Sequence, residues 1–246
     1  MMNKFRLLLL ASSLFVLNGI GHAQTSTMSL NSSNPKIVWE VKPQADLNNM
    51  GGEQISTPGF KMPDYVAVSV GDGCTIAGVW KGFKDLYETG IIDRLPRLIS
   101  VQAAGCCPIN RAIESNSPLQ PMEENTIADS IAVGVPRNPD KAMNAIRESN
   151  GIVVNVTDEE ILGAMRLLGR TCGLFGEPAG VTGAAGIKKA RQLNLIPADA
   201  TVVGIISGNG LKDVNNAIKA AGEPISIPPK MDDLLNAFKS KGFNLK

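Results

Sequence analysis

The sequence predicts an α/β fold, a three-layer αβα arrangement around a mostly parallel sheet. Two observations predict it. Short apolar runs rich in β-branched residues, such as residues 66–70, are each followed by an amphipathic helical pattern. This strand–helix alternation recurs along the chain, which is typical of a parallel sheet that helices cover on both faces.

The elements follow one another in a regular order from residue 66 onward. The predicted strands are residues 66–70, 97–102, 152–156 and 201–206. The predicted helices start near Ile76, at Pro108, at Pro139, at the capping box formed by Thr157 and Glu160, and near Ala179. Asn138 is expected to cap the helix that follows it, and the proline-containing residues 115–125 are expected to form a loop.

Composition limits both the size of the core and the kinds of partner. The chain has 246 residues, of which 43% are hydrophobic and 19% charged, so it can bury a core in one large or two small domains. A net charge of +1 gives no electrostatic argument for binding nucleic acid or an anionic membrane. The single histidine, His22, lies near the N-terminus, which leaves the remaining chain without histidine-based catalysis or metal sites.

The first 23 residues have the pattern of a secretory signal peptide. Lys4 and Arg6 form a basic start, residues 7–17 are apolar, and Ala23 closes a small-x-small exit. The apolar run is too short to span a membrane comfortably. We therefore expect a leader over residues 1–23, export to the periplasm or the exterior, and no membrane contact after cleavage. Residues 24–62 are expected to be an irregular lead-in, and residues 63–246 to form the α/β domain.

The four cysteines show no metal-binding spacing. They are Cys74, Cys106, Cys107 and Cys172, of which two are adjacent. An exported protein of this size does not require disulfides, so we expect most of them to be buried thiols.

Two glycine-flanked strand ends are the candidate ligand sites. The first is the turn Gly71, Asp72, Gly73, Cys74 and Thr75, which joins a strand to a helix. Glycines allow positive φ, and the N–H groups at a helix N-terminus favour a phosphate dianion. An ordinary tight βα turn is the alternative. The second strand end carries Ser207, and ligands of parallel sheets bind beyond the carboxyl ends of their strands.

Six stretches of the sequence, two of which contain these strand ends, form one ordered set. They are residues 70–83 (VGDGCTIAGVWKGF), 101–109 (VQAAGCCPI), 126–129 (TIAD), 156–161 (VTDEEI), 174–180 (LFGEPAG) and 207–213 (SGNGLKD). In order and spacing, over residues 63–221, they resemble the fold-type II pyridoxal-phosphate enzymes, and among these the threonine synthase branch. A serine/threonine dehydratase-like enzyme is the alternative within the same superfamily.

The resemblance implies a cofactor, a reaction and a role for several residues. Pyridoxal 5′-phosphate would be the cofactor, with its phosphate on residues 71–75 and its pyridine nitrogen hydrogen-bonded to Ser207. A neutral hydroxyl there would leave the ring largely unprotonated, which suits elimination and replacement chemistry. Glu177 would lie near the rim of the active site, or would simply complement a helix dipole. Cys106 and Cys107 would be packing residues.

The implied activity is that of a lyase in amino-acid biosynthesis. It would convert O-phosphohomoserine and water to threonine and phosphate, so the expected partners are small amino-acid or phosphorylated substrates. Such folds commonly form homodimers. This family implies the cytoplasm, in contrast to the leader.

One part of the family pattern cannot be found. The segment that supplies the Schiff-base lysine has no counterpart, although residues 29–35 resemble the stretch that precedes this half. Lys84 stands in a similar local sequence but should point to solvent with Lys81 from the first helix. No catalytic residue is assigned, and we expect a partial domain with weak or no activity. A non-catalytic, exported half-domain that binds a phosphate ligand, or an unstable truncated product, are the alternatives.

Overall fold

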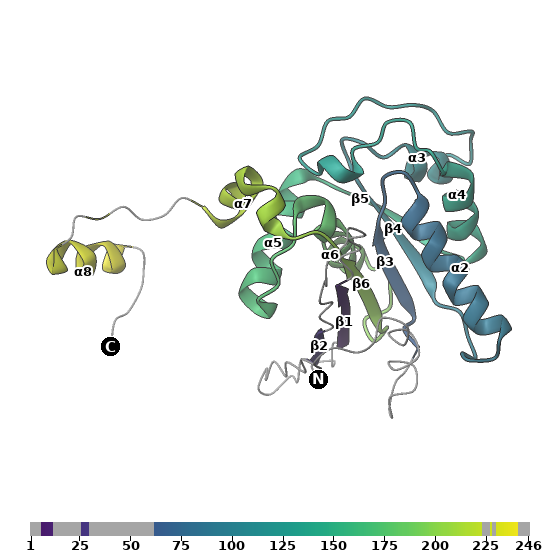
Figure 1. The fold of residues 1–246 in the computed structure, drawn as a ribbon, viewed down its shortest axis with the longest axis horizontal. Coiled ribbons are helices and arrows are strands. Elements are labelled where there is room, and N and C mark those ends of the chain that lie inside the picture. Colours follow the sequence, from purple (N-terminus) through teal and green to yellow (C-terminus); the bar gives the residue numbers. More distant parts are fainter. Residues whose placement is uncertain (1–5, 12–25, 30–61, 223–226, 228–229, 241–246) are drawn as a thin grey trace, which may run out of the picture.

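A six-stranded sheet forms the centre of the structure (Figure 1). The structure is a computed structural model that describes residues 6–11, 26–29, 62–222, 227 and 230–240. The strands are β1 (Arg6–Ala11), β2 (Ser26–Ser29), β3 (Tyr65–Ser69), β4 (Arg97–Ala103), β5 (Ile152–Val156) and β6 (Val202–Ile206). Their spatial order is β2-β1-β6-β3-β4-β5, and every neighbouring pair is parallel except β1 with β2.

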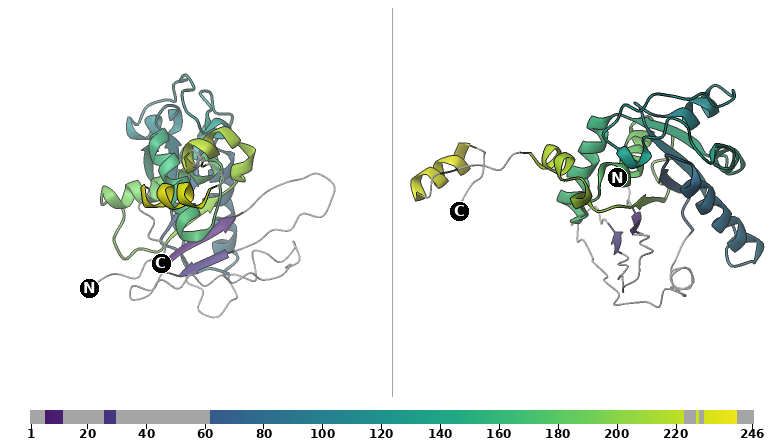
Figure 2. Two further views of the ribbon diagram at one scale, coloured as in Figure 1. Left: turned by 90° about the vertical axis from the view of Figure 1, so that its left-hand side faces the viewer. Right: turned by 45° about the horizontal axis from the view of Figure 1, so that its top comes forward.

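Helices cover both faces of this sheet. The helices of the described residues are α2 (Cys74–Glu88), α3 (Pro108–Glu114), α4 (Pro139–Glu148), α5 (Asp158–Cys172), α6 (Pro178–Gln192), α7 (Val214–Ala221) and α8 (Met231–Ser240), with short 3-10 helices η1 (Asp129–Ile131) and η2 (Gly210–Lys212). Helices α2, α3 and α4 lie on one face, and α5 and α6 on the other (Figures 1 and 2). The predicted three-layer α/β architecture is confirmed.

Strand β3 shows how the alternating side chains create two cores. Val66 and Val68 face the layer that contains Trp80 of α2, while Tyr65 and Ala67 face the layer of α6. All four strand residues are buried, as expected for a central parallel strand with helices on both sides. The start of α2 is therefore fixed by packing immediately after the strand ends.

The predicted elements of residues 66–206 are present, with ends close to those expected. The capping box of α5 is confirmed, since the Glu160 backbone N donates to Thr157 Oγ1 (3.2 Å) and the Thr157 N donates to Glu160 Oε2 (2.7 Å). The predicted cap of α4 is wrong in one respect, because the Asn138 side chain makes no capping hydrogen bond. Its backbone N instead donates to the carbonyl of Asp72 (3.0 Å), which ties this helix start to the glycine turn.

Strand β1 lies inside the segment expected to be a leader. It pairs in parallel with β6, from Leu7 opposite Val202 to Ala11 opposite Ile206. The rest of residues 1–23, and most of the lead-in, lie outside the described residues. The leader stays a prediction, and cleavage after Ala23 would remove β1 and leave the edge of β6 without its partner strand. In the ranges described, no helix has the length and apolar character needed to cross a membrane.

Polar side chains are buried between the sheet and α3. Gln102 Nε2 donates to the carbonyl of Val70 (3.2 Å), and the Asn110 backbone N donates to Gln102 Oε1 (2.8 Å). Asn110 Nδ2 donates to the carbonyls of Ser100 (3.3 Å) and Val154 (3.2 Å). Gln102, Ser100 and Asn110 are fully buried. The network therefore joins the carboxyl ends of β3, β4 and β5 at the level of the glycine turn.

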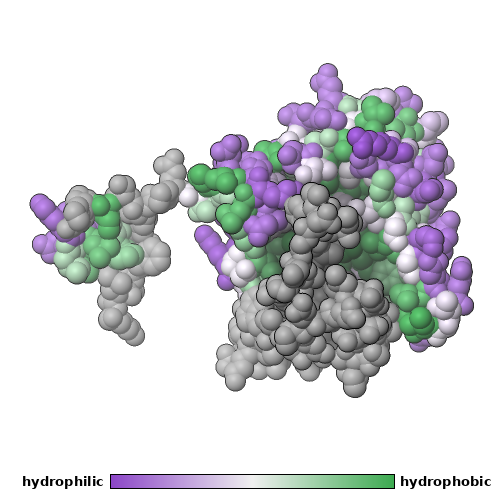
Figure 3. All heavy atoms as spheres, viewed as in Figure 1, coloured by the Kyte–Doolittle hydropathy of each residue, from purple (hydrophilic) through white to green (hydrophobic). Residues whose placement is uncertain are grey.

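Apolar side chains remain exposed beside α7. Helix α7 packs on α5, and Leu211, Val214 and Ile218 are each at least half exposed on η2 and α7. Figure 3 shows this apolar surface, whereas the outer faces of α2 and α4 are mostly hydrophilic. The expectation of a homodimer stays a prediction.

Two helical glycines differ in the space around them, and this difference can be tested. A Cβ on Gly186 of α6 would lie 2.3 Å from Cγ2 of Val101 on β4, whereas a Cβ on Gly78 of α2 would meet nothing within 4 Å. Gly186→Ala should lower the free energy of unfolding by about 1–3 kcal/mol, because α6 must move off the sheet. Gly78→Ala should raise it by roughly 0.5–1 kcal/mol. Urea denaturation of both variants measures this, and equal effects would contradict the close packing of α6 on β4.

Candidate cofactor site

The turn between β3 and α2 can be built only from glycines at two positions. Gly73 has φ of 87°, and a Cβ there would lie 2.7 Å from Cβ of Ala142 and 2.8 Å from the carbonyl O of Asn138. A Cβ on Gly71 would lie 2.8 Å from Cα of Ile131. Since the backbone passes this close to α4 and η1, any larger residue would displace the turn.

The backbone N–H groups of this turn are not used by the fold. Within the described ranges, no acceptor pairs with the N–H groups of residues 71–75. The turn is held through its oxygens instead: the Arg137 N donates to Asp72 Oδ1 (3.0 Å), and the Ala77 N donates to the Gly73 carbonyl (3.2 Å). The free N–H groups lie at the positive end of the α2 dipole, which is an arrangement that binds phosphate.

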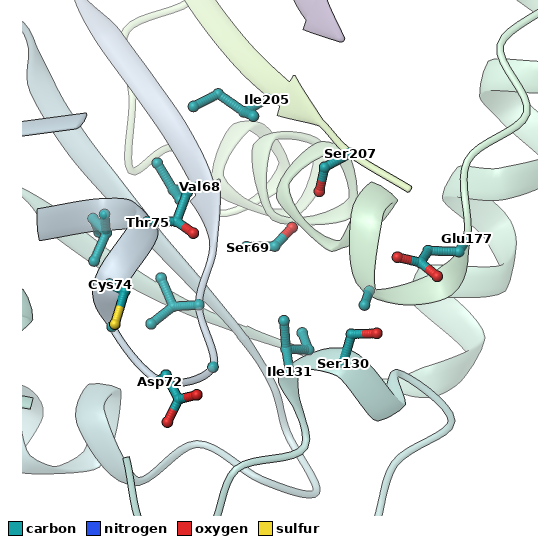
Figure 4. A pocket seen from close by; sticks show the side chains of 15 residues that line it. Val68, Ser69, Asp72, Cys74, Thr75, Ser130, Ile131, Glu177, Ile205 and Ser207 are labelled. Carbon is teal, nitrogen blue, oxygen red and sulfur yellow. The ribbon is translucent and has the colours of Figure 1, made fainter. Parts of the chain in front are cut away.

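A cavity of about 280 Å³ opens beside the turn (Figure 4). The residues that line it come from the ends of β3 and β6 and from the starts of α2 and α6, with η1 closing one side: Val68, Ser69, Val70, Gly71, Asp72, Gly73, Cys74, Thr75, Ile76, Ser130, Ile131, Glu177, Ala179, Ile205 and Ser207. The structure thus brings together all six residues that the sequence singles out for cofactor binding, from two strand ends far apart in the chain.

Ser207 is fixed by its backbone and has a free hydroxyl. A Cβ on Gly180 would lie 1.4 Å from the Ser207 carbonyl O, so the first turn of α6 packs directly on this strand end. The structure gives the Ser207 and Thr75 hydroxyls no hydrogen-bond partner among the residues described, and both side chains are exposed to the pocket. Ser69, between them, accepts a hydrogen bond from the Gly183 N (2.9 Å).

Glu177 supplies a buried carboxylate at the same end of the pocket. Its side chain is 8% exposed and forms an ion pair with Lys212, whose Nζ lies 3.1 Å from Oε1 and 3.0 Å from Oε2. Glu177 immediately precedes α6 but makes no capping hydrogen bond there. The sequence singled out Glu177 but missed Lys212, because no spacing rule links residues on a helix start and on η2.

Comparison with known protein families shows which family this chain belongs to. Residues 32–208 match the family described as pyridoxal-phosphate dependent enzyme. The chain belongs to this family. The match begins at residue 32, whereas the sequence pattern places the start of the α/β domain at residue 63.

Curated members of the family include close relatives. A threonine synthase of Methanosarcina acetivorans is 38% identical over 89% of this chain and 53% of its own length. A threonine synthase of Methanocaldococcus jannaschii is 42% identical over 73% of this chain and 45% of its own length. The chain therefore spans about half the length of the curated relatives that it matches.

Solved structures share the fold at low sequence identity. A threonine deaminase from Solanum lycopersicum superposes with a TM-score of 0.54 at 22% identity, over 65% of this chain and 44% of that one. A maize serine racemase gives a TM-score of 0.51 at 21% identity, over 64% and 46%. At this identity the likeness establishes the fold alone.

The family implies pyridoxal phosphate, and the pocket fits two parts of this cofactor. The unpaired N–H groups of residues 71–75 suit its phosphate ester, and the hydroxyl of Ser207 can donate to its pyridine nitrogen. The third requirement is a lysine, and none of the residues that line the described pocket is one. The roles of the six residues in cofactor binding stay a prediction.

Lys84 lies away from this pocket. It donates to Glu148 Oε2 (2.9 Å) on α4, which also accepts from Trp80 Nε1 (2.7 Å). The hydrogen bond to Glu148 is the main cause that raises the pKa of Lys84. The Lys84 side chain is 39% exposed, and its ammonium group also links α2 to α4. Lys81, by contrast, pairs with Asp85 within α2.

Three of the four cysteines are buried thiols, as expected, and Cys74 is not. Cys106, Cys107 and Cys172 are buried and unbridged, whereas Cys74 is exposed at the start of α2 and lines the pocket. Burial raises the pKa of both Cys106 and Cys107. Within the described residues, no group of three or more His, Cys, Asp or Glu side chains could hold a metal ion.

This difference in exposure predicts selective alkylation. Brief treatment of the folded protein with iodoacetamide should modify Cys74 alone, since the other thiols are shielded and two of them have raised pKa values. Unfolding in urea should make all four reactive. Peptide mass spectrometry measures the sites, and equally fast modification of Cys106 or Cys107 in the folded protein would contradict the described packing.

Proposed function

We propose that this chain binds pyridoxal phosphate and is the phosphate-binding part of a threonine synthase-like lyase. The observation that carries the proposal is the set of unpaired N–H groups at residues 71–75, in a turn that lines the same pocket as the free hydroxyl of Ser207. The similarity to threonine synthases over most of this chain supports the same assignment. The reaction proposed for the whole enzyme converts O-phosphohomoserine and water to threonine and phosphate.

The chain's own residues bind and orient in this proposal. The α2 N-terminus and the turn take the phosphate ester, and Ser207 donates a hydrogen bond to the ring nitrogen. A neutral hydroxyl is too weak an acid to protonate the ring nitrogen, so the ring stays largely unprotonated. A carboxylate in the place of this hydroxyl would instead favour the protonated ring nitrogen. When bound, pyridoxal phosphate supplies an electron sink for the substrate carbon next to the amino group. The lysine that this chemistry needs must come from outside the described pocket.

Binding can be tested separately from catalysis. Pyridoxine 5′-phosphate has the phosphate and ring but no aldehyde, so it cannot react with surface lysines. Gly73→Ala should weaken its binding about tenfold or more, because displacement of the turn removes charge-assisted hydrogen bonds. Ser207→Ala should weaken it only a few-fold, through one hydrogen bond. Isothermal titration calorimetry measures both.

The matched control for this experiment is Gly82→Ala. Gly82 lies on α2, and a Cβ there would meet nothing within 4 Å, so its affinity should equal that of the unaltered chain. If the unaltered chain does not bind pyridoxine 5′-phosphate, or if Gly73→Ala binds it equally well, the proposed function is wrong.

A non-catalytic role is the second candidate, favoured by the absence of lysine among the residues that line the described pocket. We expect the isolated chain to release no phosphate from O-phosphohomoserine and to form no keto acid from threonine, the dehydratase reaction. Reduction with borohydride in the presence of pyridoxal phosphate should label surface lysines sparsely. Stoichiometric labelling of one lysine, found by peptide mass spectrometry, would instead support a catalyst.

Export is proposed on the pattern of residues 1–23 alone. The basic start, apolar run and small-residue exit support cleavage after Ala23, whereas the biosynthetic reaction of threonine synthase would favour the cytoplasm. The protein recovered outside the cytoplasm should begin at Gln24. N-terminal sequencing of the fractions measures this, and recovery of the uncleaved chain from the cytoplasm alone would contradict export.

A further inference from the structure

The pocket is lined by acidic side chains but by no basic ones. Among the described residues that line it, Asp72 and Glu177 are the two carboxylates, and each can carry a charge of the same sign as a phosphate ligand. Each has a cationic partner that does not itself line the cavity: Arg137 for Asp72 and Lys212 for Glu177. An anion can enter such a pocket favourably only if these carboxylates are compensated.

The two pairs differ in closeness and burial. Arg137 Nε lies 3.9 Å from Asp72 Oδ1, and its side chain is 86% exposed. Lys212 contacts both carboxylate oxygens of Glu177 near 3 Å, and the Glu177 side chain is only 8% exposed. The Lys212 side chain is half exposed, but its contacts are shorter and the carboxylate that it meets is shielded from water, so the second pair is screened less than the first and Lys212 has the larger electrostatic effect on the pocket.

The Glu177 carboxylate borders the strand end that carries Ser207. Gly208 has φ of 69°, and a Cβ on it would lie 2.0 Å from Glu177 Oε1, so the carboxylate rests on the residue next to Ser207. The Glu177 backbone N also donates to the Gly208 carbonyl (3.1 Å). Figure 4 shows the Glu177 and Ser207 side chains at the same side of the cavity, opposite the glycine turn.

We propose that Lys212 is a positioning residue that neutralises Glu177 and so keeps the Ser207 end of the pocket suited to an unprotonated ring nitrogen. Without the ammonium group, the carboxylate would compete with the Ser207 hydroxyl for the ring nitrogen and would favour its protonation. It would also repel the anionic ligand. This inference deepens the proposed function and rests on it.

The test replaces Lys212 with residues that remove or keep the charge. Lys212→Met keeps much of the length of the side chain and removes the ammonium group. It should weaken pyridoxine 5′-phosphate binding about tenfold. It should also shift the absorbance of the bound ring towards the protonated form at a pH where the unaltered chain binds it unprotonated. Lys212→Arg keeps the charge and should retain the original spectrum.

A double variant separates charge from structure. Glu177→Gln with Lys212→Met removes both charges, so it should return the absorbance of the bound ring towards that of the unaltered chain. Arg137→Met is the matched control, because it removes the exposed ion pair between Asp72 and Arg137. The affinity of this variant for pyridoxine 5′-phosphate should change less than about threefold.

The outcomes distinguish this inference from the proposed function. If the unaltered chain fails to bind pyridoxine 5′-phosphate, the proposed function fails and the role of Lys212 fails with it. If the chain binds the ligand but Lys212→Met leaves the ring spectrum unchanged, only the role of Lys212 is wrong. The role of Lys212 is also wrong if the ring spectrum of the double variant is shifted as strongly as that of Lys212→Met. Should Lys212→Met fail to fold, Lys212→Gln removes the same ammonium group but keeps a polar side chain, and an unchanged ring spectrum in that variant would equally contradict the role of Lys212.

Discussion

The left-handed backbone at Gly73 is the constraint on which the pocket depends. Because the turn is pressed against Asn138 and Ala142, it is held through the oxygens of Asp72 and Gly73, and the N–H groups of residues 71–75 stay free. Free N–H groups at a helix N-terminus are costly unless water or a ligand satisfies them. The same packing that fixes the turn therefore creates an affinity for anions. Stability and ligand binding are coupled at this point, since a ligand that binds only the folded turn also stabilises it.

The second half of the site is held in place by strand pairing. Strands β3 and β6 are parallel neighbours, from Tyr65 opposite Val202 to Ala67 opposite Gly204, so their carboxyl ends meet at one edge of the sheet. The buried Gln102 amide holds the end of β3 through the Val70 carbonyl, and α6 packs without any intervening side chain on the end of β6. The distance between the glycine turn and Ser207 is thus set by the rigid centre of the fold, which suits a ligand that must touch both.

Sequence patterns were sufficient for the fold and for the two strand ends, because both depend on local signals. Apolar periodicity and glycine spacing located the strands, the helices and the turn. The errors concern side chains whose partners are remote in sequence. Asn138 has the residue type of a helix cap, yet its backbone is committed to the turn. The cysteine pattern predicted that most of the thiols are buried but did not show which one is exposed, and the structure places Cys74 at the pocket. The contact between Glu177 and Lys212 exists only because α6 and η2 meet beside β6, which no local pattern encodes.

Attraction for a phosphate ligand arises here from the backbone and not from basic side chains. Among the described residues that line the pocket there is no Lys or Arg, so the favourable potential comes from oriented N–H groups and the α2 dipole. Such a potential is a property of the fold, and the charged side chains around it, such as Glu177 and its partner Lys212, add to it or subtract from it. Covalent chemistry, in contrast, needs one amine at one position. Binding and catalysis are therefore separable in this architecture: in the proposed function the described pocket holds a phosphorylated ring through its backbone, and a reaction additionally requires a lysine, which is not among the described residues that line the pocket.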